Sequence, residues 1–127
     1  MAQHKILVVD DDEALREALH TVLINAGYTA LEAKDGGEGL LIAEKEKPDL
    51  ILLDIMMPNT NGHEMLNALR KTSWGKDMHV LLLTNADDAT NIAHGVSLRS
   101  NDYIIKSNTS LEEILKRVKQ HLAGYYD

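Results

Sequence analysis

Acidic side chains collect at the ends of short apolar runs in this sequence. Residues 6–9 are apolar and lead directly into three aspartates at 10–12, and the apolar run 50–53 leads into Asp54. Three carboxylates gathered at one place would repel each other by about 4 kcal/mol per pair at 4 Å and an effective dielectric near 20. Such a site needs a counter-charge, and its all-oxygen character favours a hard divalent cation such as Mg2+.

Polar groups that complement the acids follow the later apolar runs. Residues 80–83 lead into Thr84, and residues 103–105 lead into Lys106. In open parallel sheets, ligands bind outside the carboxyl ends of the strands, where the strand order reverses. If these runs are strands of one such sheet, a hydroxyl and an ammonium group lie at the same edge as the carboxylates, and Lys106 supplies part of the counter-charge.

The apolar runs alternate with helical patterns, and this alternation predicts the elements that would position the polar groups. Helices are expected over residues 12–26, before Pro48, around residues 65–69, more weakly over residues 87–98, and from Ser110 onward. The strands are apolar throughout, as expected when both faces of a sheet are covered. We therefore expect an α/β fold with a five-stranded parallel sheet, doubly wound as (βα)5, in a single domain over residues 1–127.

Length and composition limit the classes of function. The chain has 127 residues, a net charge of -7 and no cysteine. The negative charge opposes direct binding to nucleic acid, because phosphate contacts need a basic patch. The lack of cysteine excludes disulfides and thiolate metal sites. Residues 1–10 do not have the pattern of a secretory signal, and no apolar run approaches membrane-spanning length. We expect a soluble, cytoplasmic protein with no membrane insertion.

Helix capping explains part of the acidic pattern. An aspartate directly before a helix is a good N-cap, and Asp12 is expected to serve that purpose. Capping explains neither the two acids before Asp12 nor an acid at the end of the run 50–53. Asp10, Asp11 and Asp54 therefore remain the candidates for chemistry.

Four segments of the sequence resemble the signature segments of bacterial response-regulator receiver domains of the chemotaxis type. They are KILVVDDDEALREAL, PDLILLDIMMPNTNG, VLLLTN and DYIIKS. Thr84 stands 30 positions after Asp54, and Lys106 stands 22 positions after Thr84, as in that family. The resemblance covers the whole chain, and it implies the flavodoxin-like strand order 2-1-3-4-5 for the sheet. It implies a two-component signalling protein that catalyses formation and slow loss of its own aspartyl phosphate, rather than an enzyme that turns over a substrate.

The resemblance assigns roles to the acids and their neighbour. It implies Asp54 as the phosphoacceptor, Asp11 as a direct Mg2+ ligand, and Asp10 as an acid that acts on the ion mainly through water. The main-chain carbonyl of Met56 would be a further ligand. No other cofactor is implied.

The same resemblance implies the roles of later residues and the kinds of partner. Thr84 and Lys106 match the hydroxyl and the lysine that act with the phosphoacceptor, while Thr84 and Tyr103 match the switch positions. The donor would be a phosphohistidine on a sensor histidine kinase or phosphotransfer protein, and the target a downstream protein or an output domain. The output surface would comprise the helix over residues 87–98, the strand over 103–105 and the last helix.

Three places depart from the family pattern without removing a charged member of the site. Asn85 stands where a small residue is usual, Ser107 stands where proline usually follows the lysine, and Arg99 with Ser100 stands where Gly and Ala are usual. A cis peptide before a residue other than proline costs about 2.5–4 kcal/mol. We therefore expect a trans bond between Lys106 and Ser107.

Other functions stay open on the sequence alone. A haloacid dehalogenase-type hydrolase also forms an aspartyl phosphate, but it needs a second acid where this chain has Met56, and a lid domain. A flavodoxin-like flavin binder needs aromatic-flanked loops, whereas this chain has one Trp and four Tyr. A phosphorylation-independent adaptor module is the main alternative.

The remaining notable residue types have structural interpretations. The six histidines show no ligand spacing near the acids and are interpreted as ordinary surface or partly buried side chains. The glycines within residues 36–39 indicate a turn and a helix start rather than a nucleotide-binding loop. Trp74 and Gly75 are expected in a surface loop.

Overall fold

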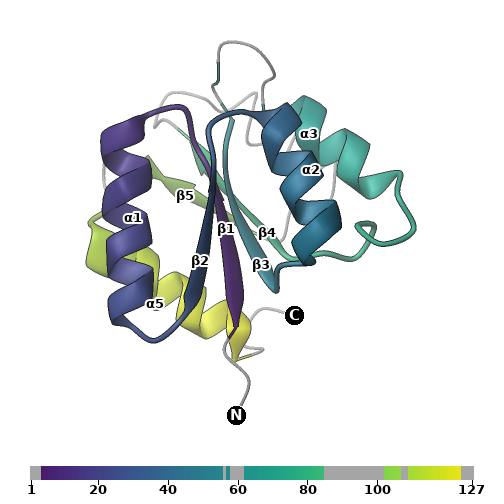
Figure 1. The fold of residues 1–127 in the computed structure, drawn as a ribbon. Coiled ribbons are helices and arrows are strands. Elements are labelled where there is room, and N and C mark those ends of the chain that lie inside the picture. Colours follow the sequence, from purple (N-terminus) through teal and green to yellow (C-terminus); the bar gives the residue numbers. More distant parts are fainter. Residues whose placement is uncertain (1–3, 56, 58–61, 85–101, 107–108, 124–127) are drawn as a thin grey trace.

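Five parallel strands form one sheet in the computed structural model, which describes residues 4–55, 57, 62–84, 102–106 and 109–123. The sheet has the order β2-β1-β3-β4-β5, as predicted, and Figure 1 shows its twist. The strands are β1 (Lys5–Val9), β2 (Thr29–Ala33), β3 (Leu50–Asp54), β4 (Val80–Thr84) and β5 (Asp102–Ile105).

Helices cover both faces of this sheet. Helices α1 and α5 lie on one face, and α2 and α3 lie on the other (Figure 1), so the predicted doubly wound architecture is confirmed. The described helices are α1 (Glu13–Asn25), α2 (Gly36–Glu46), α3 (Gly62–Arg70) and α5 (Leu111–Leu122). None of them combines the length and the hydropathy that a membrane crossing requires. The helix expected over residues 87–98 lies outside the described residues.

Alternating strand residues build two hydrophobic cores, because successive side chains of a strand point to opposite faces of the sheet. On one face, Leu7, Ile51 and Leu53 pack with α2 and α3, and on the other face, Val8 and Leu52 pack with α1 and α5. Every residue of β3 and β4 is buried, as the continuous apolar runs predicted.

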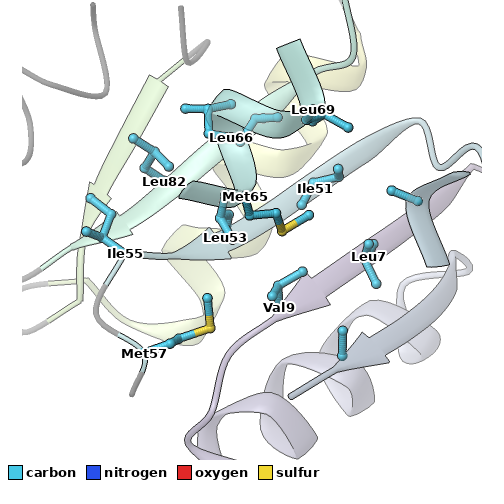
Figure 2. Packing of buried hydrophobic residues seen from close by; sticks show 13 residues of the cluster. Leu7, Val9, Ile51, Leu53, Ile55, Met57, Met65, Leu66, Leu69 and Leu82 are labelled. Atoms are coloured by element: carbon cyan, nitrogen blue, oxygen red, sulfur yellow. The ribbon is translucent and has the colours of Figure 1, made fainter. Parts of the chain in front are cut away.

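Helix α3 contributes three large side chains to the first core. Figure 2 shows Met65, Leu66 and Leu69 lying over the strands, in a cluster that includes Ile51 and Leu53 of β3. All three helical side chains are buried. Truncating a buried leucine of this kind to alanine costs about 2–5 kcal/mol. This packing holds the start of α3 close to the end of β3.

Side-chain caps set the starts of three helices. The Asp12 carboxylate accepts the Leu15 N–H at 3.2 Å, which confirms its predicted role as N-cap of α1. Asp35 caps α2 in the same way, so the glycine-rich segment begins a helix as expected. Ser110 accepts the Glu113 N–H at 3.2 Å at the start of α5. Caps of this type contribute about 1 kcal/mol each.

The segment between α3 and β4 differs from the expected surface loop. Gly75 is buried, and Trp74 packs against the first core with part of its ring exposed. A Cβ on Gly75 would lie 2.6 Å from Leu69 Cδ1, so this position needs glycine for packing. The loop was predicted correctly, but its exposure was not, because the turn folds back onto the end of α3.

Candidate functional site

The ends of β1 and β3 bring the candidate acids together. Val9 pairs with Leu53 in the parallel register, so Asp10 directly after β1 lies next to Asp54 at the end of β3. Carboxylate oxygens of Asp10, Asp11 and Asp54 lie within 4.8 Å of one another. Asp10 and Asp54 are buried, whereas Asp11 is exposed. The predicted gathering of these three acids at one sheet edge is therefore present.

Hydrogen bonds orient the buried Asp10. Its N–H donates to the Ala33 carbonyl at 3.1 Å, which ties the end of β1 to the end of β2. Its Oδ1 accepts the Asp12 N–H at 2.9 Å. Asp10 therefore presents its remaining oxygen, Oδ2, toward the interior of the acidic site.

Lys106 lies beside two of the three acids. Its Nζ is 3.4 Å from Asp10 Oδ2 and 3.5 Å from Asp54 Oδ1, and its side chain is 22% exposed. Three carboxylates and one ammonium leave two excess negative charges, which one divalent cation would neutralise. Because all the donor atoms are oxygens and Asp11 opens to solvent, the residues fit a hard ion that keeps part of its water shell, as Mg2+ does.

The candidate switch residues occupy neighbouring strands. Thr84 is buried at the end of β4, one position beyond Leu83, which pairs with Asp54. Tyr103 lies on β5 opposite Leu82, and its side chain is partly exposed. Met56, the remaining predicted ligand, lies outside the described residues, as do the positions that depart from the family pattern.

Gly62 is a site residue that the motif reading did not single out. Its N–H donates to the Ile55 carbonyl at 2.8 Å, and a Cβ there would lie 2.5 Å from the carbonyl oxygen of Asp54. No side chain fits in that space, so glycine lets the first turn of α3 approach the main chain of the candidate phosphoacceptor. The Asn-Gly pair at 61–62 was the available sequence signal.

Arg16 also contacts the site without having been predicted. Its Nη1 donates to the Asp10 carbonyl at 2.8 Å, and its Nε donates to Glu32 Oε1 at 3.1 Å. The guanidinium therefore touches the main chain, but not the carboxylate, of a candidate metal-binding acid.

Two histidines belong to a separate network at the amino ends of the strands, opposite the carboxyl ends where the acids lie. His121 of α5 is buried, and its Nε2 lies 3.0 Å from Asp102 Oδ2 at the start of β5. Its Nδ1 lies 2.7 Å from Nε2 of His79, directly before β4. Because a carboxylate only accepts, Nε2 of His121 donates to Asp102, and a neutral ring would leave Nδ1 to accept from His79. His63 is buried as well. His63 and His121 are therefore more buried than the sequence indicated.

Asp102 also forms an ion pair with the guanidinium of Arg117. The same guanidinium donates a hydrogen bond to the Tyr103 carbonyl at 3.1 Å. Burial by itself would raise the pKa of the Asp102 carboxyl. The hydrogen bonds from Arg117, His121 and the Tyr103 N–H outweigh burial and hold that pKa below its ordinary value. The network joins α5 to the starts of β4 and β5, away from the acidic site.

A family model described as the response regulator receiver domain matches residues 6–119. The response regulator MprA of Mycolicibacterium vanbaalenii is 40% identical over 115 residues, which cover 91% of this chain and 48% of that protein. MprA of Mycobacterium leprae is 39% identical over 115 residues, which cover 91% of this chain and 49% of that protein. The chain thus spans about half the length of these curated relatives.

Solved structures of similar proteins superpose on nearly the whole chain. The chemotaxis protein CheY4 of Vibrio cholerae superposes with a TM-score of 0.87 at 31% identity, covering 94% of this chain and 98% of that one. A CheY-like response regulator receiver domain protein of Methanospirillum hungatei gives 0.88 at 29% identity, covering 96% and 95%.

Proposed function

This chain belongs to the response regulator receiver domains of two-component signalling, and we propose that it accepts a phosphoryl group on Asp54 in a Mg2+-dependent reaction. We propose further that residues 1–127 act as a single receiver domain, and that phosphorylation alters a surface read by a partner.

One observation carries the proposal. The carboxylates of Asp10, Asp11 and Asp54 lie within 4.8 Å of one another, and the Lys106 ammonium lies 3.4 and 3.5 Å from two of them. Asp10 and Asp54 are buried, and like charges held this close in a buried site are costly unless a counter-ion offsets them. The excess of two negative charges matches the charge of a divalent cation. Formation of an acyl phosphate on Asp54 would use both the cation and the lysine to offset the charge of the phosphoryl oxygens.

The proposed reaction is an in-line transfer to the Asp54 carboxylate. One Asp54 oxygen attacks the phosphorus of a phosphohistidine, the P–N bond breaks, and the departing imidazole nitrogen takes a proton from solvent. The products are an acyl phosphate on Asp54 and a neutral histidine on the donor. Lys106 approaches the developing charge on the phosphoryl oxygens, so its contribution is electrostatic.

Mg2+ would be held by Asp10, Asp11, Asp54 and the Met56 carbonyl, and when bound it supplies positive charge that offsets the phosphoryl oxygens. The protein supplies the remaining requirements. Asp10 is oriented by the Asp12 and Ala33 main chains, so the acidic edge is organised before the ion arrives.

The proposed output follows from the position of Thr84. Thr84 is buried on β4 directly after Leu83, the residue that pairs with Asp54, so we expect its hydroxyl to meet a phosphoryl oxygen on Asp54 after a small movement. Tyr103 lies one strand further out with part of its ring in solvent. We assign the change of surface to β5, α5 and the helix expected over residues 87–98, with Thr84 and Tyr103 as the switch.

The partners and the location belong to the same proposal. The donor is a sensor histidine kinase or a phosphotransfer protein, and the reader is a downstream protein or an output domain rather than nucleic acid. Because kinases of this kind draw on ATP, we place the reaction in the cytoplasm.

Small phosphodonors test this function without a known kinase. Phosphoramidate carries the same P–N linkage as phosphohistidine, whereas acetyl phosphate carries an acyl P–O linkage. Intact-mass measurement should show one added phosphoryl group per chain with Mg2+, none with excess chelator, and none in Asp54→Asn. Equal labelling of Asp54→Asn would refute the assignment, and no labelling of the natural chain under any donor would favour the phosphorylation-independent adaptor.

A further inference from the structure

Arg16 connects three segments around the acidic site. It lies in the first turns of α1, and helical side chains lean toward the helix N-terminus, so its guanidinium reaches back to the end of β1. There Nη1 donates to the Asp10 carbonyl at 2.8 Å, while Nε donates to Glu32 on β2 at 3.1 Å. The Arg16 side chain is 15% exposed, and both contacts are partly buried.

These contacts hold the main chain of Asp10 from both sides. The Asp10 N–H donates to Ala33, and the Asp10 carbonyl accepts from Arg16. Because a peptide unit is planar, holding the Asp10 carbonyl also holds the plane from which Asp11 departs. Asp11 is exposed, so the main chain before it is a principal determinant of where its carboxylate lies.

Glu32 balances the charge of Arg16. Its Oε1 pairs with the guanidinium at 3.1 Å, and His20 approaches its second oxygen at 4.0 Å. Glu32 stands one residue before Ala33, so the same end of β2 holds the Asp10 N–H and the guanidinium. The pairing offsets part of the repulsion between the arginine and a metal cation.

We propose that Arg16 is a positioning residue for the cation site, acting through the Asp10–Asp11 peptide rather than through contact with the ion. This inference rests on the proposed function. It predicts that Arg16 sets the Mg2+ affinity by geometry, since the guanidinium carries two hydrogen bonds that a point charge does not reproduce.

Geometry and charge predict opposite effects of removing Arg16. If the guanidinium acted only as a nearby positive charge, its loss would make the site more negative and tighten Mg2+ binding. If it acts by positioning, its loss lets the Asp10–Asp11 peptide reorient and weakens binding. Partners that orient metal ligands typically change affinity by about 10–100-fold. The sign of the change therefore separates the two explanations.

The chain offers a matched control in Arg70. This arginine ends α3 and donates to two main-chain carbonyls, those of Gly75 at 2.9 Å and Met78 at 2.7 Å. Like Arg16, it holds main-chain carbonyls. It lies near the amino end of β4, however, whereas the acids lie at the carboxyl ends of the strands. Arg70→Met should reduce stability without changing Mg2+ affinity.

The experiment measures Mg2+ affinity by titration calorimetry and unfolding by urea for the natural chain, Arg16→Met, Arg16→Lys and Arg70→Met. We expect about tenfold weaker binding in Arg16→Met, an intermediate loss in Arg16→Lys, and none in Arg70→Met. Arg16→Lys keeps the charge and serves as the test if Arg16→Met does not fold.

Each other outcome is decisive. Unchanged or tighter binding in Arg16→Met, Arg16→Lys behaving as the natural chain, or an equal loss in Arg70→Met would overturn the positioning role while leaving the proposed function intact. A natural chain that binds no Mg2+ would overturn both.

Discussion

Replacing Lys106 by methionine tests the charge balance of the site. The ammonium lies 3.4 Å from Asp10 and 3.5 Å from Asp54, and each pair corresponds to about 5 kcal/mol at an effective dielectric of 20. Desolvation of both partners and the 22% exposure of Lys106 offset most of that attraction. We expect a net loss of about 1–3 kcal/mol in the free energy of unfolding without Mg2+.

Mg2+ affinity should move in the other direction. Without the ammonium the site carries three excess negative charges instead of two, so we expect Lys106→Met to bind Mg2+ roughly tenfold more tightly, or about 1.4 kcal/mol. Phosphorylation by acetyl phosphate should nevertheless slow, because the charge that offsets the phosphoryl oxygens is gone.

Calorimetric titration, urea unfolding and labelling kinetics measure these three effects on one protein sample, and Lys106→Arg is the control that keeps the charge. Weaker Mg2+ binding in Lys106→Met would refute the reasoning, because it would mean that Lys106 organises the acids rather than balancing them.

Further predictions concern other parts of the molecule. Gly62→Ala should destabilise the chain by about 2 kcal/mol or more and slow labelling, since the new Cβ would lie 2.5 Å from the Asp54 carbonyl. Gly37→Ala, where the nearest atom is 3.5 Å away, should be neutral or stabilise α2 by up to about 1 kcal/mol in urea unfolding. Asp102→Asn should cost about 1–3 kcal/mol near neutral pH. Because the Asp102 pKa is lowered, its stabilisation is present above the ordinary value of 3.8 and is lost as the pH falls through the lowered pKa, so unfolding curves of Asp102→Asn and the natural chain should converge in acid. Ala86 stands two positions after Thr84, where the side chain in receiver domains tunes the attack of water on the acyl phosphate. Alanine cannot orient water, so we expect slow dephosphorylation of the natural chain and faster dephosphorylation of Ala86→Glu, and equal decay rates would contradict this.

The sheet and the placement of the acids could be predicted because they follow from local pattern. Continuous apolar runs predicted strands buried on both faces, and β3 and β4 are buried throughout. Parallel strands end at one edge, which brought Asp10, Asp54 and Lys106 together without any knowledge of side-chain packing. The cap at Asp12 followed from residue type at the helix start.

The contacts that escaped prediction depend on packing between distant elements. His79 and His121 are 42 positions apart, and their pairing depends on how α5 crosses the start of β4. Arg16 could equally have pointed to solvent, and only the approach of Glu32 on β2 shows why it turns toward the acidic edge. Gly62 required the closeness of α3 to the Asp54 carbonyl, which sequence spacing does not reveal.

Borohydride trapping tests the central claim most directly. An acyl phosphate on an aspartate is reduced to the corresponding alcohol, which gives homoserine at the modified position and can be located by peptide mass spectrometry. After treatment with acetyl phosphate and Mg2+, the account predicts homoserine at position 54 alone, and none when a chelator is present. Homoserine at position 10 or 11, or trapping at position 54 that does not depend on Mg2+, would contradict it.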